Sequence, residues 1–338
     1  MVLVSHLTKR YGGHTAVDDL SFTVEEGQIY GFLGPNGAGK STTMNIMTGC
    51  LAATSGQVTI GGYDIFEEAA QAKRLMGYLP EQPPLYLDRT PREYLTFVAQ
   101  AKGVPAGELT MQIDRVMAET GISHVAGRLI KNLSKGYRQR VGIAQALLGD
   151  PKVIILDEPT VGLDPKQMVE IRSLIQALGK EHTVILSSHI LSEVQAVCQK
   201  ILIISSGKLV ACDTPEHLEK LFAGSTQVAL TVEAGQEELQ TMLQPLELQS
   251  LQITAMTPQR CGVTLETIGG EDDVCRKLFF LFAEAGKPIL RMTTSRASLE
   301  DIFLELTGGG TDAASKETEQ SSTASAEAVA QAAKEELQ

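Results

Sequence analysis

Residues 34–41 read GPNGAGKS and fit the pattern G-x-x-x-x-G-K-[ST]. They directly follow the apolar run IYGFL at residues 29–33, which is typical of a buried strand. Glycines at positions 34, 37 and 39 let the backbone adopt positive φ, so that successive N–H groups can surround an anion in front of the next helix's dipole. The sequence therefore predicts a strand, a phosphate-binding loop and a helix over residues 41–48.

Within this loop, the pattern assigns Lys40 to the β and γ phosphates of a nucleotide and the Ser41 hydroxyl to Mg²⁺. The strand before the loop and the helix after it disfavour the alternative, a glycine-rich surface turn. The nucleotide-binding residues expected here, besides these two, are Gly34, Pro35, Asn36, Gly37, Ala38, Gly39 and Thr42.

Two acidic residues follow a second apolar run, VIIL at residues 153–156. A run that is apolar throughout is expected of a parallel strand covered on both faces, and α/β sheets bind ligands at the carboxyl ends of such strands. We expect Asp157 to hold Mg²⁺ directly or through water and Glu158 to act as general base, rather than both lying in a solvated acidic turn.

Three further residues are candidates for the same site. His189 follows the apolar run at residues 184–186 and could contact the γ-phosphate and hold the attacking water, although a histidine in such a place is more often an ordinary surface residue. Tyr11 could stack on a base or simply pack on a sheet. Ser134 is placed to cap another helix, whose start would be the second helix start in the chain that could face phosphate.

The composition is that of an ordinary globular protein of 338 residues, long enough for two domains with full cores. A formal net charge of -12 argues against sequence-independent binding to nucleic acid. No apolar run reaches the roughly 18 residues that span a bilayer, and the first residues do not resemble a signal peptide. Five cysteines without a C-x-x-C spacing suit a reduced cytosol, so we expect the protein to stay where it is made.

Strands and helices alternate through residues 1–223, beginning with short strands at residues 2–7 and 21–24. This order predicts an α/β domain with a mainly parallel sheet and a helical insertion over residues 90–120, interrupted at residues 105–107. Beyond that point the apolar period changes to two, and the order βαββαβ in residues 224–308 predicts a small α+β, ferredoxin-like domain. The last of its predicted helices carries Leu299, Ile302, Phe303 and Leu306 on one face. Residues 309–338 read as a disordered acidic tail.

The chain resembles the nucleotide-binding subunits of ATP-binding cassette (ABC) transporters, whose fold is a P-loop NTPase cassette. The match runs in the family's order from Tyr11 to about Phe222. GPNGAGKS is similar to the Walker A loop, VIILDE to Walker B, LSKGYRQR (133–140) to the signature motif and GLDP (162–165) to the D-loop. By this resemblance His189 is the switch histidine, and Tyr11 stacks on adenine.

The chain departs from the family pattern in two motifs. The usual LSGGQ has Lys135 and Tyr137 in place of its first Gly and its Gln, whereas Ser134 and Gly136, the groups that would touch phosphate, are kept. In the Q-loop region Glu81, not Gln82, stands at the usual Gln position, so either residue could meet the metal or its water.

LSKGYRQR and SLEDIFLELTG (298–308) are similar to subunits of type 2 ABC exporters, whose permeases are separate chains. The resemblance implies an ATPase that uses ATP and Mg²⁺, forms a homodimer and drives export through a membrane permease. Such a subunit is cytoplasmic and peripheral on the cytoplasmic face of the cell membrane. The alternatives are a soluble cassette ATPase acting on DNA or ribosomes, which commonly has two cassettes or long coiled coils, and a GTPase, for which an N-K-x-D motif is missing.

Overall fold

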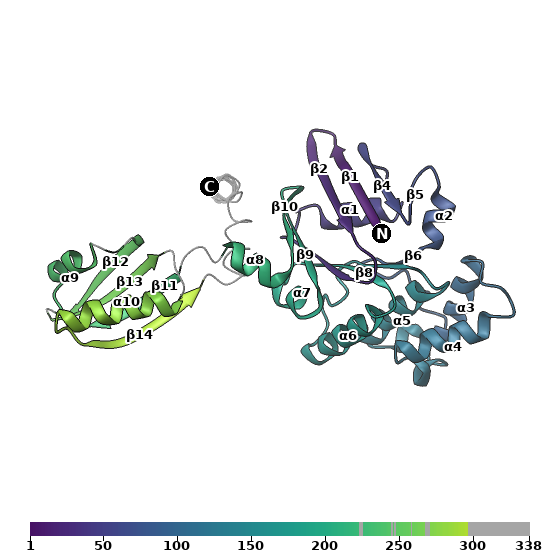
Figure 1. Ribbon diagram of the computed structural model, residues 1–338. Coiled ribbons are helices and arrows are strands. Elements are labelled where there is room, and N and C mark those ends of the chain that lie inside the picture. The colour runs from purple at the N-terminus through teal and green to yellow at the C-terminus, as the bar shows by residue number, and fades with distance from the viewer. Residues whose placement is uncertain (223–225, 245, 247, 258, 268–270, 297–338) are drawn as a thin grey trace, which may run out of the picture. The chain divides into compact units, whose positions relative to one another are not determined.

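The computed structural model describes residues 1–222, 226–244, 246, 248–257, 259–267 and 271–296 (Figure 1). They belong to two compact units, Met1–Pro215 and Glu216–Glu305, the second described as far as Arg296. This division falls at residue 215, whereas the sequence predicted a domain boundary at residue 223, because α8 (Pro215–Phe222) groups with the second unit. The tail at 309–338 and the helix expected around Leu299 lie outside the described residues.

The first unit is built on a six-stranded sheet with the order β10-β9-β3-β8-β7-β6. Neighbouring strands are parallel except in the β9–β10 hairpin, so the predicted mainly parallel sheet is confirmed. The strands are β3 (Ile29–Leu33), β6 (Met76–Leu79), β7 (Val153–Leu156), β8 (Thr183–Ser188), β9 (Lys200–Ser205) and β10 (Lys208–Asp213). Because β3, β7 and β8 are neighbours, the residues after each of them meet at one edge.

A second sheet in the same unit is antiparallel and has the order β2-β1-β4-β5. Its strands are β1 (Val2–Tyr11), β2 (His14–Val24), β4 (Ser55–Ile60) and β5 (Tyr63–Asp64). Buried side chains of this sheet and of the six-stranded sheet form one apolar core. Leu7 of β1, Leu20 of β2 and Phe32 of β3 belong to it. The sequence predicts short strands here but no separate sheet, since nonlocal pairing leaves no periodic signal in either strand.

The predicted helical insertion consists of α3 (Pro91–Ala101) and α4 (Leu109–Glu119), with the expected interruption between them. Thr90 and Glu93 form a capping box at the start of α3, which explains why the helix begins there. Two short 3-10 turns, η1 (Ser123–Val125) and η2 (Ile130–Asn132), lead to α5 (Lys135–Leu147).

Four more helices belong to the first unit: α1 (Lys40–Met47), α2 (Ala69–Arg74), α6 (Pro165–Leu178) and α7 (Leu191–Val197). Helix α7 packs closely on the central strand β3. A Cβ added at Gly31 would lie 2.1 Å from Val194 Cγ1 and 2.9 Å from Cys198 Sγ, so only glycine allows this approach.

The second unit contains β11 (Thr226–Val232), α9 (Gln236–Leu243), β12 (Leu248–Thr257), β13 (Arg260–Thr267), α10 (Glu271–Glu284) and β14 (Ile289–Arg296). The four strands form an antiparallel sheet in the order β12-β13-β11-β14. Apolar side chains of both helices and the sheet form its core, among them Leu239, Val263 and Phe282. In the part of the chain that the structure describes, no helix combines the length and the apolar character needed to span a membrane.

Candidate nucleotide site

The loop between β3 and α1 is fixed by its glycines and by β2. Gly39 caps α1 with a φ of 101°, a left-handed conformation that side chains disfavour. A Cβ at this position would also lie 2.5 Å from the backbone oxygen of Ala16 in β2. The loop therefore packs directly on the antiparallel sheet, and its shape depends on glycine.

A pocket of about 460 Å³ opens beside this loop. Most of the predicted site residues line it, together with three that the sequence analysis did not single out, His14, Ala16 and Val161. The predicted lining residues are Tyr11, Asn36, Gly37, Gly39, Lys40, Ser41, Thr42, Glu81, Glu158 and His189.

The remaining predicted loop residues lie behind this pocket surface. The backbone oxygens of Gly34 and Pro35 accept hydrogen bonds from Lys40 Nζ at 2.7 and 3.2 Å, and Ala38 N donates to Pro35 O at 3.2 Å. Of the two Q-loop candidates, Glu81 lines the pocket and Gln82 is not part of its lining.

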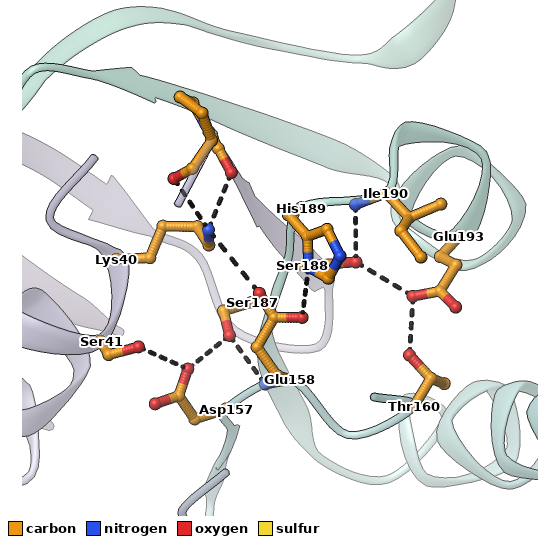
Figure 2. Close-up of polar contacts among 12 residues, drawn as sticks. Lys40, Ser41, Asp157, Glu158, Thr160, Ser187, Ser188, His189, Ile190 and Glu193 are labelled. Carbon is orange, nitrogen blue, oxygen red and sulfur yellow. Dashed lines mark hydrogen bonds and ion pairs between the residues drawn. The ribbon is translucent and has the colours of Figure 1, made fainter. Parts of the chain in front are cut away.

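Lys40 is the cation of the site and is only 6% exposed. Its Nζ lies 3.6 Å from Glu158 Oε1 (Figure 2). Burial lowers the pKa of Lys40, and the negative charge of Glu158 opposes this shift. Because little water screens this buried ammonium, a phosphate oxygen that replaces Glu158 beside Lys40 would interact strongly with it.

Asp157 and Glu158, which follow β7, are held by a serine of the neighbouring strand β8. Ser187 Oγ donates to Asp157 Oδ1 at 2.6 Å and accepts from Glu158 N at 2.8 Å (Figure 2). Ser41 Oγ donates to the same Asp157 oxygen at 3.4 Å. Ser187 was not predicted as a site residue, because its only sequence signal is a hydroxyl near the end of a buried strand.

His189 and Glu158 form a second pair at this edge of the sheet. His189 Nδ1 and Glu158 Oε2 lie 3.0 Å apart, so the two oxygens of one carboxylate contact the imidazole and the Lys40 ammonium separately. A glutamate carboxylate at this edge of the sheet is a candidate general base toward water, and in this structure its two oxygens are engaged by Lys40 and His189.

Tyr11 lies at the end of β1, lines the pocket and is 48% exposed. Lys9 Nζ approaches its ring to 5.1 Å from the centroid, which is within the range of a cation–π contact. The exposed aromatic surface beside the pocket is suited to stack on a planar base.

Ser134 and Gly136 do not reach this pocket. Ser134 caps α5, as predicted, by accepting a hydrogen bond from Tyr137 N. Both residues line a separate hollow of about 190 Å³, together with Asp164 and Gln167 of the α6 start. Within one chain the structure therefore does not join the predicted signature residues to the phosphate loop.

The residues around the loop fit a nucleotide with its metal better than a metal held by protein groups only. In the residues that the structure describes, no cluster of three or more His, Cys, Asp or Glu side chains is arranged to hold a metal. The hydroxyl of Ser41 and the carboxylate of Asp157 lie together, and Mg²⁺ is commonly bound by one or two such protein groups with phosphate oxygens and waters completing the shell.

Comparison with protein families identifies a match to the family described as ABC transporter over residues 17–161. The chain is 37% identical over 313 residues to the bacitracin transport ATP-binding protein BcrA of Bacillus licheniformis, covering 92% of this chain and 98% of that protein. It is 32% identical over 312 residues to the linearmycin resistance ATP-binding protein LnrL of Bacillus subtilis, covering 91% and 98%.

Solved structures of ATP-binding cassettes are similar to about two thirds of the chain. An ATP-binding subunit of an ABC transporter aligns with a TM-score of 0.60 and 29% identity, covering 66% of this chain and 93% of that chain. A dimeric ATP-binding cassette in a post-hydrolysis state, bound to ADP and Pi, aligns with a TM-score of 0.57 and 25% identity, covering 63% and 98%.

Proposed function

The chain belongs to the ATP-binding subunits of ABC transporters, and we propose that it hydrolyses ATP as a homodimer to drive export through a separate membrane permease. The observation that carries this proposal is the set of contacts around Glu158. Its carboxylate lies between Lys40 of the phosphate loop and His189, at the edge where α/β sheets bind ligands.

We assign the nucleotide contacts to residues of the pocket and its loop. Lys40 and the backbone of residues 34–39 would bind the β and γ phosphates, with Thr42 next to them and Tyr11 against the adenine. Ser41 and Asp157 would hold Mg²⁺, which offsets the negative charge of the phosphates when bound. Of Glu81 and Gln82, we favour Glu81 for the metal or its water because it lines the pocket.

Two side chains would act directly in ATP hydrolysis. Glu158 would accept a proton from the attacking water, and His189 would hold that water near the γ-phosphate. Ser134 and Gly136 of a second copy would cover the open side of the pocket and exclude bulk water from it.

Replacement of Glu158 by Gln tests this assignment. Glu158→Gln keeps the size of the side chain but removes the proton acceptor, so ATP should still bind, hydrolysis should fall by at least ~100-fold, and an ATP-stabilised dimer should accumulate. Hydrolysis is measured as phosphate release, and dimers by size-exclusion chromatography with ATP. Glu181→Gln, at an exposed glutamate, is the matched control. Normal turnover in Glu158→Gln would exclude Glu158 as the base.

Two relatives support the export assignment, since their names refer to bacitracin transport and linearmycin resistance. The subunit would bind its permease from the cytoplasmic face as a peripheral protein. An exposed apolar cluster, made of Phe97 of α3 and of Tyr86 and Leu87 in the segment before α3, is suited to this contact. The Tyr86 and Phe97 rings lie 5.4 Å apart. The net charge of -12 makes the alternative, an ATPase acting on DNA or ribosomes, a poorer fit.

Affinity capture from detergent-solubilised membranes tests this contact. The wild type should retain an integral membrane protein, and Phe97→Ser should retain much less, while Met111→Ser, at an exposed methionine outside the cluster, should match the wild type. Equal capture by both variants would exclude the cluster as the permease contact.

We also propose that the part of the second unit from β11 to β14 belongs to a separate ferredoxin-like domain, residues 224–308, followed by an acidic tail. The support is its β-α-β-β-α-β order together with a fully antiparallel sheet in which β11 and β13 are the inner strands.

A further inference from the structure

A buried carboxylate outside the nucleotide pocket lies behind His189. Glu193, in the first turn of α7, is only 4% exposed and is not part of the pocket lining. Its Oε2 atom accepts two hydrogen bonds, from Thr160 Oγ1 at 2.6 Å and from Ser188 Oγ at 3.0 Å (Figure 2). Thr160 and Ser188 are buried as well.

These two hydroxyls lie next to the proposed catalytic groups, one in the turn after β7 and the other on the last residue of β8. Thr160 follows Glu158 by two residues, in the turn closed by a hydrogen bond from Val161 N to Glu158 O. Ser188 directly precedes His189, and its Oγ also accepts from Ile190 N at 3.0 Å. One oxygen of Glu193 therefore joins the segment after β7 to the segment after β8.

The helix that carries Glu193 is itself held tightly. Val194 and Cys198 pack on Gly31 of β3, the strand that leads into the phosphate loop, with no room for even one added methyl group. The carboxylate thus projects from a fixed helix between two loops, and its position relative to Lys40 and the loop is set by β3.

Stability is a poor explanation for a carboxylate in this place. Its second oxygen, Oε1, is buried and finds no hydrogen-bond partner among the described residues. A buried polar atom without a partner destabilises the folded state, so an apolar residue would serve packing better. This arrangement suggests that Glu193 serves to position neighbouring groups and not to stabilise the fold.

We infer that Glu193 is a positioning residue for ATP hydrolysis, which accepts from Thr160 and Ser188 and so keeps His189 at hydrogen-bond distance from Glu158. The inference rests on the proposed roles of Glu158 and His189. Because both hydrogen bonds end on one oxygen, the role needs an acceptor of this length and does not need the negative charge.

Two substitutions of Glu193 separate these requirements. Glu193→Leu removes the acceptor. The kcat per ATP-binding site should then fall roughly tenfold or more, while the Kd for ATP should stay within about twofold of the wild type. The reason is that misplaced catalytic groups slow the reaction but do not weaken the contacts that bind ATP. Glu193→Gln keeps an acceptor oxygen of the same reach and should retain most of the wild-type kcat. Glu181→Gln is the control at an exposed position.

Turnover is expressed per site that binds ATP, so that partial unfolding of a variant is not mistaken for a lower kcat. Unchanged kcat per site in Glu193→Leu would overturn the inference, and so would equal losses in the Leu and Gln variants. The wild type must hydrolyse ATP and Glu158→Gln must not. That result tests the proposed function, and it is separate from the outcome at Glu193.

A double-mutant cycle keeps the inference testable if Glu193→Leu fails to fold. Thr160→Val and Ser188→Ala each remove one donor, and the double variant should lose little more kcat per site than the worse single variant. Independent, additive losses would mean that the two loops are not joined through Glu193.

Discussion

Glu158 combines a buried carboxylate with a backbone φ of 47°, a conformation that non-glycine residues rarely adopt. Such a conformation costs about 1 to 3 kcal/mol and persists only where neighbouring contacts hold it. Here the amide of Glu158 donates to Ser187, and its two carboxylate oxygens contact Lys40 and His189. The strain is located at the residue that the proposed reaction depends on most.

Tyr11 gives a prediction at the same scale. As a stacking surface it should tolerate Tyr11→Phe, whereas Tyr11→Ala should weaken ATP binding by about 1 to 2 kcal/mol, or roughly tenfold in Kd. Titration with a fluorescent ATP analogue measures the effect. Lys40→Ala, which removes the buried cation, should be much more harmful. Unchanged binding in Tyr11→Ala would mean that Tyr11 serves only the β1–β2 hairpin.

Site residues that stand in a local sequence motif could be predicted from the sequence. Site residues whose position depends on the order of the strands in the sheet could not. Lys40 and Ser41 stand at fixed places in a loop motif, and Asp157 follows an apolar run. Ser187 and Glu193 act only because β8 lies between β3 and β7 and because α7 packs on β3. That order is a property of the folded sheet, which no single segment encodes.

At the scale of elements, α3 and α5 are joined by one lysine. Lys102, at the end of α3, donates from Nζ to the backbone oxygens of Gln145 (3.0 Å), Ala146 (3.1 Å) and Leu148 (2.8 Å). These are carbonyls of the last turn of α5, which have no partner within the helix. A cation there also interacts favourably with the negative end of the helix dipole.

Lys102→Met should therefore lower the free energy of unfolding by about 1 to 2 kcal/mol, because methionine replaces the unbranched stem of the side chain but donates nothing to the three carbonyls. Urea denaturation followed by circular dichroism measures the change. Lys180→Met, at an exposed lysine, should leave the stability within about 0.5 kcal/mol of the wild type. If both variants unfold at the same urea concentration, Lys102 does not stabilise the end of α5.

Elements with strong periodicity were predicted closely, whereas sheet membership was not. The interruption between α3 and α4 follows from Pro105 and Gly107, and the cap of α5 follows from Ser134. The antiparallel sheet around β1 was missed, because its strands alternate as any half-buried strand does and their partners lie far along the chain.

At the scale of the whole molecule, Ser134 and Gly136 lie apart from the phosphate loop, and we propose that a second copy completes each site. A phosphate loop covers one side of a triphosphate, and the other side must be closed before charges act at low dielectric. Two copies related by a two-fold axis would build two such sites at once.

Mixing two inactive variants tests this sharing. Lys40→Ala and Ser134→Arg should each fail to occlude ATP, but their heterodimer should contain one site that is wild type in both halves and occlude about one ATP per dimer. Occluded nucleotide is measured after gel filtration of heterodimers isolated through two affinity tags. Heterodimers without occluded ATP, from parents that both fold, would exclude shared sites.

The contact between Lys40 and Glu158 also bears on which anions can compete for the site. Before any ligand enters, the charge of the ammonium is already partly neutralised by the carboxylate, so a simple anion such as sulfate or inorganic phosphate must displace Glu158 to gain the same contact. A triphosphate can offset that displacement with many backbone N–H groups of the loop, whereas a small ion cannot. The protein should thus discriminate against small anions through its own carboxylate, and Glu158→Gln should be more sensitive to sulfate than the wild type.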